Sequence, residues 1–188
     1  NLRLKRLLLN AKLTQPACLE DIDYKHPRGL NKQTLLELSS SDWIARHQTV
    51  LLTGPTGVGK SYIACALGNF AARHGHTVLY LRAPRLFETL LQSKADGSHL
   101  KMLTRLAKVQ LLIVDDLFLT PLDDSQRNDL LEIIEDRYHK ALEEFGDEWG
   151  NKLMFHHRWW AEVDQNALAL VLARGMAPAA DDATVAGM

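Results

Sequence analysis

A glycine-rich run holds the residues of this chain best suited to chemistry. Residues 54–61 read Gly-Pro-Thr-Gly-Val-Gly-Lys-Ser, directly after the apolar run at 49–52 and before a helix-compatible stretch at 62–67. This is the pattern G-x-x-x-x-G-K-[ST] between a strand and a helix. Glycines let the backbone turn with its N–H groups inward, and the start of a helix adds free N–H groups and a positive dipole end. The pattern predicts a loop that holds the phosphates of a nucleoside triphosphate; the alternative is a turn that binds nothing.

The last two residues of the run have distinct expected roles. Lys60 can reach the β- and γ-phosphates, and the Ser61 hydroxyl is placed to ligand Mg²⁺. We therefore expect ATP and Mg²⁺ as cofactors, and we count Lys60 among the catalytic residues as well. The residues expected to bind the nucleotide are Gly54, Pro55, Thr56, Gly57, Val58, Gly59, Lys60, Ser61 and Tyr62.

A second element supplies two carboxylates. Residues 109–116 form a mostly apolar stretch that ends in Asp115 and Asp116, as expected of a strand buried on both faces of a parallel sheet. Parallel strands bring their carboxyl ends to one edge, so these acids should arrive beside the glycine-rich loop. We expect Asp115 to assist Ser61 in holding Mg²⁺ and Asp116 to polarise a water for attack on the γ-phosphate. The alternative is a strand that ends in two solvated acids.

The composition limits the class of protein. The chain has 188 residues, 46% of them hydrophobic and 24% charged, with a net charge of −1, which suits one globular domain with a core. No apolar run approaches the roughly 18 residues that span a membrane, so we expect no membrane partner and a cytoplasmic location. Cys18 and Cys65 are expected to be reduced and buried. Because the chain begins with Asn1, we expect a fragment or a processed product.

Charge is unevenly distributed along the chain. Residues 1–12 and 82–108 are mainly basic, whereas residues 115–148 are strongly acidic. Such a division permits a basic face for DNA, pairing between subunits, or solvated helix faces. The basic residues whose spacing puts them on shared helix faces are Arg3, Lys5 and Arg6, and Lys101, Arg105 and Lys108.

Strands and helices are expected to alternate along the chain, which predicts a parallel α/β sheet with right-handed crossovers. The expected strands lie at 49–53, 77–81 and 109–116, and the expected helices at 2–9, 31–46, 60–74, 85–93, 99–108 and 125–142.

The order of these motifs resembles the IstB/DnaC-like branch of the AAA+ ATPases over about residues 2–140. The matching pieces are 19–23, 36–38 with 42–44, 51–61, 66–68, 113–117 and 135–138. IstB proteins are ATP-dependent helpers of insertion-sequence transposases, and their DnaC relatives load the replicative helicase. The resemblance implies a P-loop NTPase fold of AAA+ type and ATP hydrolysis. It also implies assembly on DNA, a transposase partner and a nucleotide-dependent homo-oligomer.

The last part of the chain departs from that branch. After Tyr138 the branch has a further strand ending in a polar sensor residue, and then a helix with an arginine that acts on a neighbouring subunit. Neither feature is evident in residues 141–188, so we expect a sheet that lacks a central strand and is incomplete at its C-terminal end. The expected divisions are a basic helix and linker at 1–30, an ATPase core at 31–142 and a divergent, partly disordered tail at 143–188.

Two alternatives to a transposition helper remain open at this stage, and a third class is disfavoured. A DnaC-like helicase loader carries the same motifs. A nucleotide-binding remnant without turnover is consistent with the altered tail. A small-molecule kinase would need an acceptor pocket and an arginine-rich lid, and the sequence suggests neither.

Overall fold

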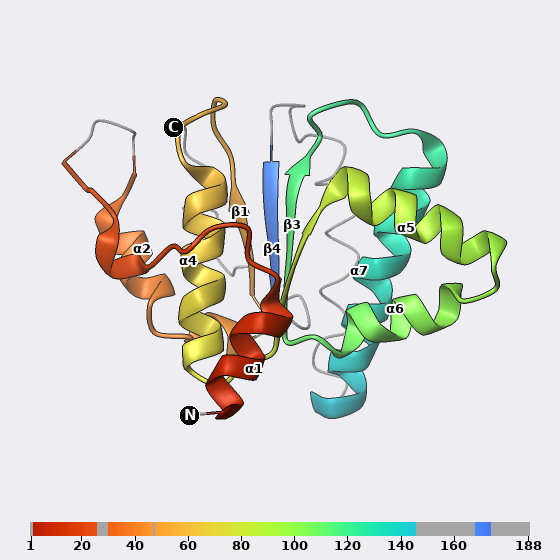
Figure 1. Cartoon of the computed structure of the whole chain (residues 1–188), viewed down its shortest axis with the longest axis horizontal. Helices are drawn as coiled ribbons and strands as arrows, with labels where there is room; N and C mark the ends of the chain where they lie inside the picture. Colours follow the sequence, from red (N-terminus) through yellow and green to blue (C-terminus); the bar gives the residue numbers. More distant parts are fainter. Residues whose placement is uncertain (1, 26–29, 47, 146–167, 174–188) are drawn as a thin grey trace.

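The computed structural model describes residues 2–25, 30–46, 48–145 and 168–173. Figure 1 shows their arrangement around a central sheet. The helices are α1 Leu2–Ala11, the 3-10 turn η1 Leu19–Asp21, α2 Lys32–Leu38, α3 Asp42–Ala45, α4 Lys60–Arg73, α5 Ala83–Ala95, α6 His99–Lys108 and α7 Asp124–Phe145. The strands are β1 Thr49–Leu52, β2 Val78–Arg82, β3 Leu111–Leu117 and β4 Leu168–Ala173.

The strands form one sheet in the order β1-β4-β3-β2. Strands β2 and β3 are parallel, and their register pairs Arg82 with Asp115. Strand β4 is antiparallel to both β1 and β3, so β1, β2 and β3 all run in the same direction. Their carboxyl ends therefore lie at one edge of the sheet, the upper edge in Figure 1. This edge is where the sequence predicts the nucleotide site.

Strand β4 corrects the expectation that the sheet lacks a central strand. Residues 168–173 occupy the position between β1 and β3, although they run antiparallel to both neighbours. The parallel sheet flanked by helices is thus confirmed for β1, β2 and β3 but does not extend to β4. A strand at this position pairs backbone N–H and C=O groups that a gap would leave without partners. The remainder of the predicted tail, residues 146–167 and 174–188, lies outside the described residues.

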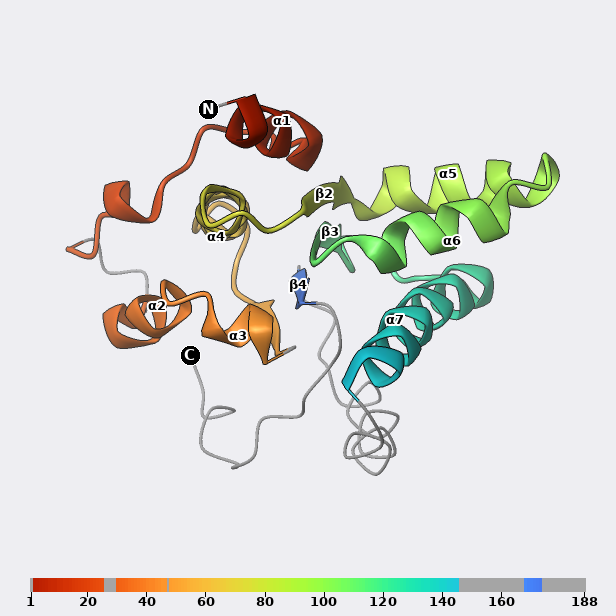
Figure 2. The same cartoon turned by 90° about the horizontal axis from the view of Figure 1, so that it is seen from below.

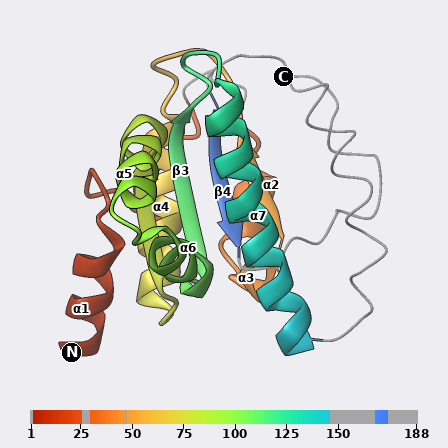
Figure 3. The ribbon, with the colours of Figure 1, turned by 90° about the vertical axis from the view of Figure 1, so that its right-hand side faces the viewer.

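Helices cover both faces of the sheet, and the alternation along β3 divides the core in two. Leu112 and Val114 pack with α5, α6 and α7, whereas Leu111 and Ile113 pack with residues of α1, α3 and α4. Figure 2 shows α1 to α4 on one side of the sheet and α5 to α7 on the other. Figure 3 shows α7 beside the sheet with α5 and α6. Burial on both faces explains why β3 is apolar until its last residues.

The helix predicted over residues 31–46 is instead two short helices, α2 and α3. The hydroxyls of Ser39 and Ser40 donate to the carbonyls of Leu36 and Glu37, at 2.6 and 2.9 Å. Ser41 then takes a left-handed backbone with φ 61°. Serine side chains that bind nearby backbone groups compete with continued helix, which explains the break.

Local signals in the sequence explain where two of the helices begin or end. Helix α4 begins at the end of the glycine-rich loop, and Gly75 follows it with φ 92°, a left-handed backbone suited to glycine at a helix end. Asp123 and Gln126 cap the start of α7 reciprocally, each side chain accepting from the other's backbone N–H at 2.8 and 3.1 Å.

Both cysteines are free, as predicted, but only Cys65 is buried, since Cys18 is half-exposed. Among the described residues, no helix combines the length and apolar character needed to cross a bilayer.

Candidate nucleotide-binding site

The glycine-rich loop joins β1 to α4 through backbone conformations that favour glycine. Gly57 and Gly59 have φ of 87° and 100°. A Cβ on Gly57 would meet no atom within 4 Å, so the left-handed backbone rather than lack of space calls for glycine at this position. Gly59 is the N-cap of α4 and has no side chain to bind the first N–H groups of the helix. These N–H groups can therefore serve the oxygen atoms of an anion.

The Lys60 side chain folds back across the loop. Its Nζ donates to the carbonyl oxygens of Gly54 and Pro55, at 2.7 and 2.8 Å. These bonds hold a positive charge at the loop, where the sequence predicts the β- and γ-phosphates. Ser61 follows in the first turn of α4 and is half-buried. Both residues are therefore at the predicted place, and their roles toward a nucleotide remain predictions.

Asp115 is a buried carboxylate near the end of β3, with 3% of its surface exposed. Its Oδ2 accepts a hydrogen bond from the hydroxyl of Tyr80 in β2, and its Oδ1 accepts one from the Asp116 N–H at 2.9 Å. In the described part of the chain, Asp115 forms no salt bridge with a basic residue. Arg82, the β2 residue in register with Asp115, directs its salt bridge to Asp116. Burying the negative charge of Asp115 is costly, and a divalent cation beside it would offset that cost. The carboxylate thus fits the predicted role of magnesium ligand.

Asp116 lies at an irregularity of the sheet. The pairing of β3 with β4 shifts register between Val114 and Leu117, and Asp116 has a left-handed φ of 57°. Bulges of this kind redirect side chains near functional sites. The side chain of Asp116 accepts a hydrogen bond from Arg82 Nε at 2.5 Å in a salt bridge that is partly open to solvent. The carboxylate predicted to polarise water is therefore held by a guanidinium.

These contacts change the acid–base properties of two neighbouring side chains. Burial raises the pKa of the Tyr80 hydroxyl far above its usual range, and the hydrogen bond to Asp115 raises it further. Tyr80 is therefore a neutral donor at physiological pH. The hydrogen bond and the negative charge of Asp116 raise the pKa of the exposed Arg82.

Sequence reasoning did not find Tyr80 or Arg82 as part of this site. Both belong to β2, whose residues 77–81 are recognisable only as an apolar strand. The signal that could have found them is the alternation along β2, since Tyr80 and Arg82 project from the same side of the strand. The parallel register then places them beside Ile113 and Asp115 of β3.

The family relationship of the chain follows from comparison with known proteins. The family described as "IstB-like ATP binding protein" matches residues 1–143. The chain belongs to this IstB-like family. A protein assigned as the ATP-binding protein of insertion sequence IS1162 from Pseudomonas fluorescens is 51% identical over 136 residues, which are 72% of this chain and 59% of the relative. The corresponding protein of insertion sequence IS21 from Pseudomonas aeruginosa is 31% identical over 134 residues, 71% of this chain and 51% of the relative.

Solved structures support the AAA+ type of P-loop fold for this IstB-like chain. AMPPCP-bound DnaA from Aquifex aeolicus aligns with a TM-score of 0.58 and 18% identity, over 66% of this chain and 39% of that one. DnaI aligns with a TM-score of 0.54 and 23% identity, over 71% of this chain and 68% of that one. At these identities the likeness concerns the fold. The chain spans little more than half the length of the insertion-sequence relatives compared above.

Proposed function

We propose that this IstB-like chain binds ATP with Mg²⁺, hydrolyses it, and acts on DNA as a helper of transposition. One observation carries the ATPase proposal. The glycine-rich loop with Lys60 follows β1, the two carboxylates lie near the carboxyl end of β3, and these two strands run in the same direction and end at the same edge of the sheet. The names of the relatives, which place them in insertion sequences, support the transposition context.

Each residue at this edge has a role that its position supports. Lys60 would exchange its two carbonyl partners for phosphate oxygens, because a charge-assisted bond to phosphate is stronger. Ser61 and Asp115 would hold Mg²⁺, which when bound neutralises charge on the β- and γ-phosphates. Asp116 would polarise the attacking water after its carboxylate is released from Arg82.

The phosphate-loop assignment is tested with Lys60→Ala and a fluorescent ATP analogue. We expect at least a tenfold loss of affinity, since about 1.5–3 kcal/mol is typical for hydrogen bonds to charged groups. Lys101→Ala removes an exposed lysine from α6 and serves as the matched control. Equal affinity of the parent and Lys60→Ala would refute the assignment.

The two carboxylates are separated by their amide variants. Asp115→Asn is expected to weaken the dependence of nucleotide binding on Mg²⁺, whereas Asp116→Asn should bind ATP and fail to hydrolyse it. Steady-state phosphate release with and without duplex DNA provides the reference. A parent that binds ATP but shows no turnover in either condition would instead support a nucleotide-binding remnant.

The DNA part of the proposal rests on α6. Lys101, Arg105 and Lys108 are exposed on this helix, whereas Leu103 and Leu106 are buried. Among the described residues, none of the three basic side chains forms a salt bridge. Three cations on one exposed helix face suit contacts with the phosphates of DNA, with little preference for sequence. The basic residues of α1 are exposed as well and offer a second face.

Binding to random duplex DNA across a salt series tests this surface. Changing all three basic residues of α6 to Gln should reduce the slope of log K against log salt by about 2.7, about 0.9 for each phosphate contact. The control variant removes the same charge from exposed positions outside both basic stretches, with Gln at Lys25, Lys32 and Arg46. A slope that falls equally in both variants would remove α6 as a specific DNA surface.

The remaining part of the proposal is assembly and a transposase partner. ATP would promote homo-oligomers along the duplex, so that weak contacts add up to useful avidity. Sedimentation with a non-hydrolysable ATP analogue, with and without DNA, would detect such assembly. A transposase gene beside the gene for this chain would favour the transposition helper over a helicase loader.

A further inference from the structure

A small polar cluster lies behind the candidate magnesium site. Tyr80 is only 4% exposed, and its hydroxyl donates to Asp115. Thr14 Oγ1 lies 3.5 Å from Cys65 Sγ, and Cys65 packs in the same buried cluster as the Tyr80 ring. The four side chains come from the segment after α1, from α4, from β2 and from β3, so no single element creates the cluster.

The cluster restrains the orientation of the Asp115 carboxylate. Oδ2 is bound by the Tyr80 hydroxyl and Oδ1 by the Asp116 N–H, so both oxygens are fixed in position. A carboxylate has about four lone-pair sites, and two hydrogen bonds leave the others for a metal ion or a metal-bound water. The plane of the carboxylate is therefore set while its capacity for a cation is retained.

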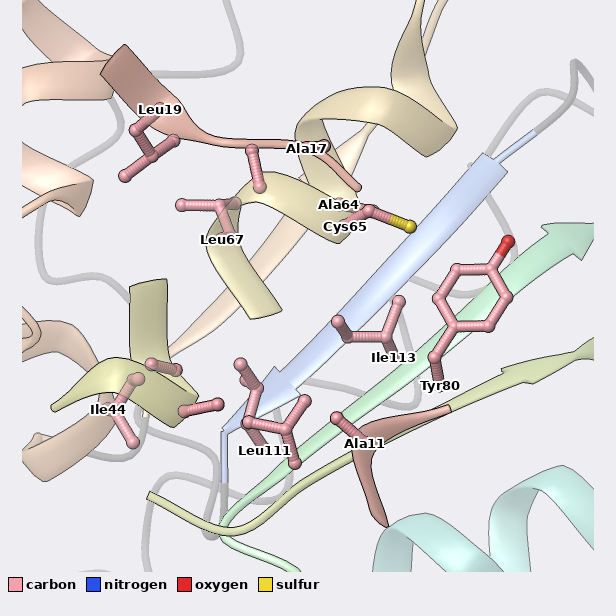
Figure 4. Packing of buried hydrophobic residues seen from close by; sticks show 14 of the residues in the cluster. Ala11, Ala17, Leu19, Ile44, Ala64, Cys65, Leu67, Tyr80, Leu111 and Ile113 are labelled. Carbon is pink, nitrogen blue, oxygen red and sulfur yellow. The ribbon is translucent and has the colours of Figure 1, made fainter. Parts of the chain in front are cut away.

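Tyr80 is itself anchored by its surroundings. Its ring packs in the core between the sheet and α4, where Figure 4 shows it on the same side of the sheet as Ile113 and Cys65. Thr14 lies in the segment that leads from α1, and Ala11 and Ala17 on either side of it are fully buried. Because α1 packs on α4 and β2, the N-terminal segment has a defined place beside the cluster.

We propose that Tyr80 is a positioning residue for the magnesium ligand Asp115, and that Thr14, through its contact with Cys65, joins the N-terminal segment to the core that holds Tyr80 in place. The proposal rests on the function proposed above, because it requires Mg²⁺ at Asp115. Hydrogen-bond partners that orient a metal ligand typically account for about 10–100-fold in metal affinity. A static core position for Tyr80, by contrast, would affect stability without affecting Mg²⁺ in particular.

The test uses the full chain, a fluorescent ATP analogue and magnesium chloride. Affinity for the analogue is measured first in EDTA and then across a Mg²⁺ series at fixed nucleotide. The parent shows whether Mg²⁺ strengthens binding at all; if it does not, the proposed magnesium site fails before Tyr80 is considered. Given that dependence, Tyr80→Phe keeps the ring and removes the hydroxyl. We expect unchanged affinity in EDTA and about a tenfold rise in the Mg²⁺ concentration for half-saturation.

Two further variants keep the outcome interpretable. Ser93→Ala removes another buried hydroxyl, one that donates to the Leu90 carbonyl in α5, and should leave the Mg²⁺ series unchanged. Thr14→Val changes an exposed residue, so it should fold even if Tyr80→Phe does not, and it should shift the Mg²⁺ series in the same direction by less. The proposal would be overturned if Tyr80→Phe needed the same Mg²⁺ concentration for half-saturation as the parent, or if it lost affinity equally with and without Mg²⁺. If only Thr14→Val folds, a half-saturating Mg²⁺ concentration equal to that of the parent in this variant would overturn the proposal as well.

Discussion

Arg137 of α7 is a buried cation that joins elements around β3, and we expect Arg137→Met to lower the free energy of unfolding. The Arg137 side chain is 1% exposed. Its Nη1 donates to the carbonyls of Leu106 and Val109, both at 2.7 Å, and Nη2 donates to that of Gln110 at 3.3 Å. The last carbonyls of α6 have no partners within the helix, and a cation at this end also favours the helix dipole. Arg137 thereby joins α7 to the end of α6 and the approach to β3.

The expected loss in the free energy of unfolding is about 3 kcal/mol. Arg137→Met leaves three carbonyls without their donor, at about 1 kcal/mol each, the lower end of the range for stranded groups. We use the lower end because the variant also avoids burying a guanidinium, which is itself unfavourable. For a chain of this size, about 3 kcal/mol corresponds to a fall in Tm of roughly 9 °C.

Urea unfolding followed by circular dichroism measures this loss. Arg73→Met is the matched control, because Arg73 forms an exposed salt bridge with Glu20 at 2.8 Å, with 45% and 58% of the two side chains exposed. Exposed pairs contribute about 0–1 kcal/mol, so this variant should remain close to the parent. A loss below about 1 kcal/mol in Arg137→Met would refute the reasoning, since it would mean that water or neighbouring groups satisfy the three carbonyls equally well.

Three further variants test other features of the structure. Arg82→Gln should raise ATP turnover without DNA while leaving nucleotide affinity unchanged, because it frees Asp116 from a salt bridge; reduced turnover would show that Arg82 instead positions this carboxylate. Burial lowers the pKa of His76, and the nearby His74 lowers it further, so the folded state favours the neutral ring. The stability of the fold should therefore decrease as the pH drops below about 6.5. His76→Gln should flatten that part of the pH profile in urea unfolding, and an unchanged profile would exclude His76 as its source. Asp123→Ala removes the cap of α7 and should cost about 1 kcal/mol in the same assay, whereas no loss would argue against the cap.

The features predicted correctly from the sequence are those that short segments of chain determine. The loop at 54–61 is recognisable because the glycines, the lysine and the serine have fixed spacing between a strand and a helix. The apolar run before Asp115 indicates a strand buried on both faces, and the structure places β3 at Leu111–Leu117 with both faces covered by helices. In each case the signal lies within a short run of residues, so the pattern itself carries the information.

Tertiary structure decided which distant residues complete the site. Tyr80 and Arg82 reach Asp115 and Asp116 across about 35 positions of sequence, and only the parallel register of β2 and β3 brings them together. The direction of β4 is likewise invisible in residues 168–173, because backbone pairing accepts an apolar strand in either direction. Arg137 reads as one charge among many on an acidic helix, and its burial depends on where α6 ends. The sequence by itself determined the glycine-rich loop suited to phosphates. Packing between elements determined how Asp115 and Asp116 of β3 are oriented, because their orientation depends on contacts between residues far apart in the chain.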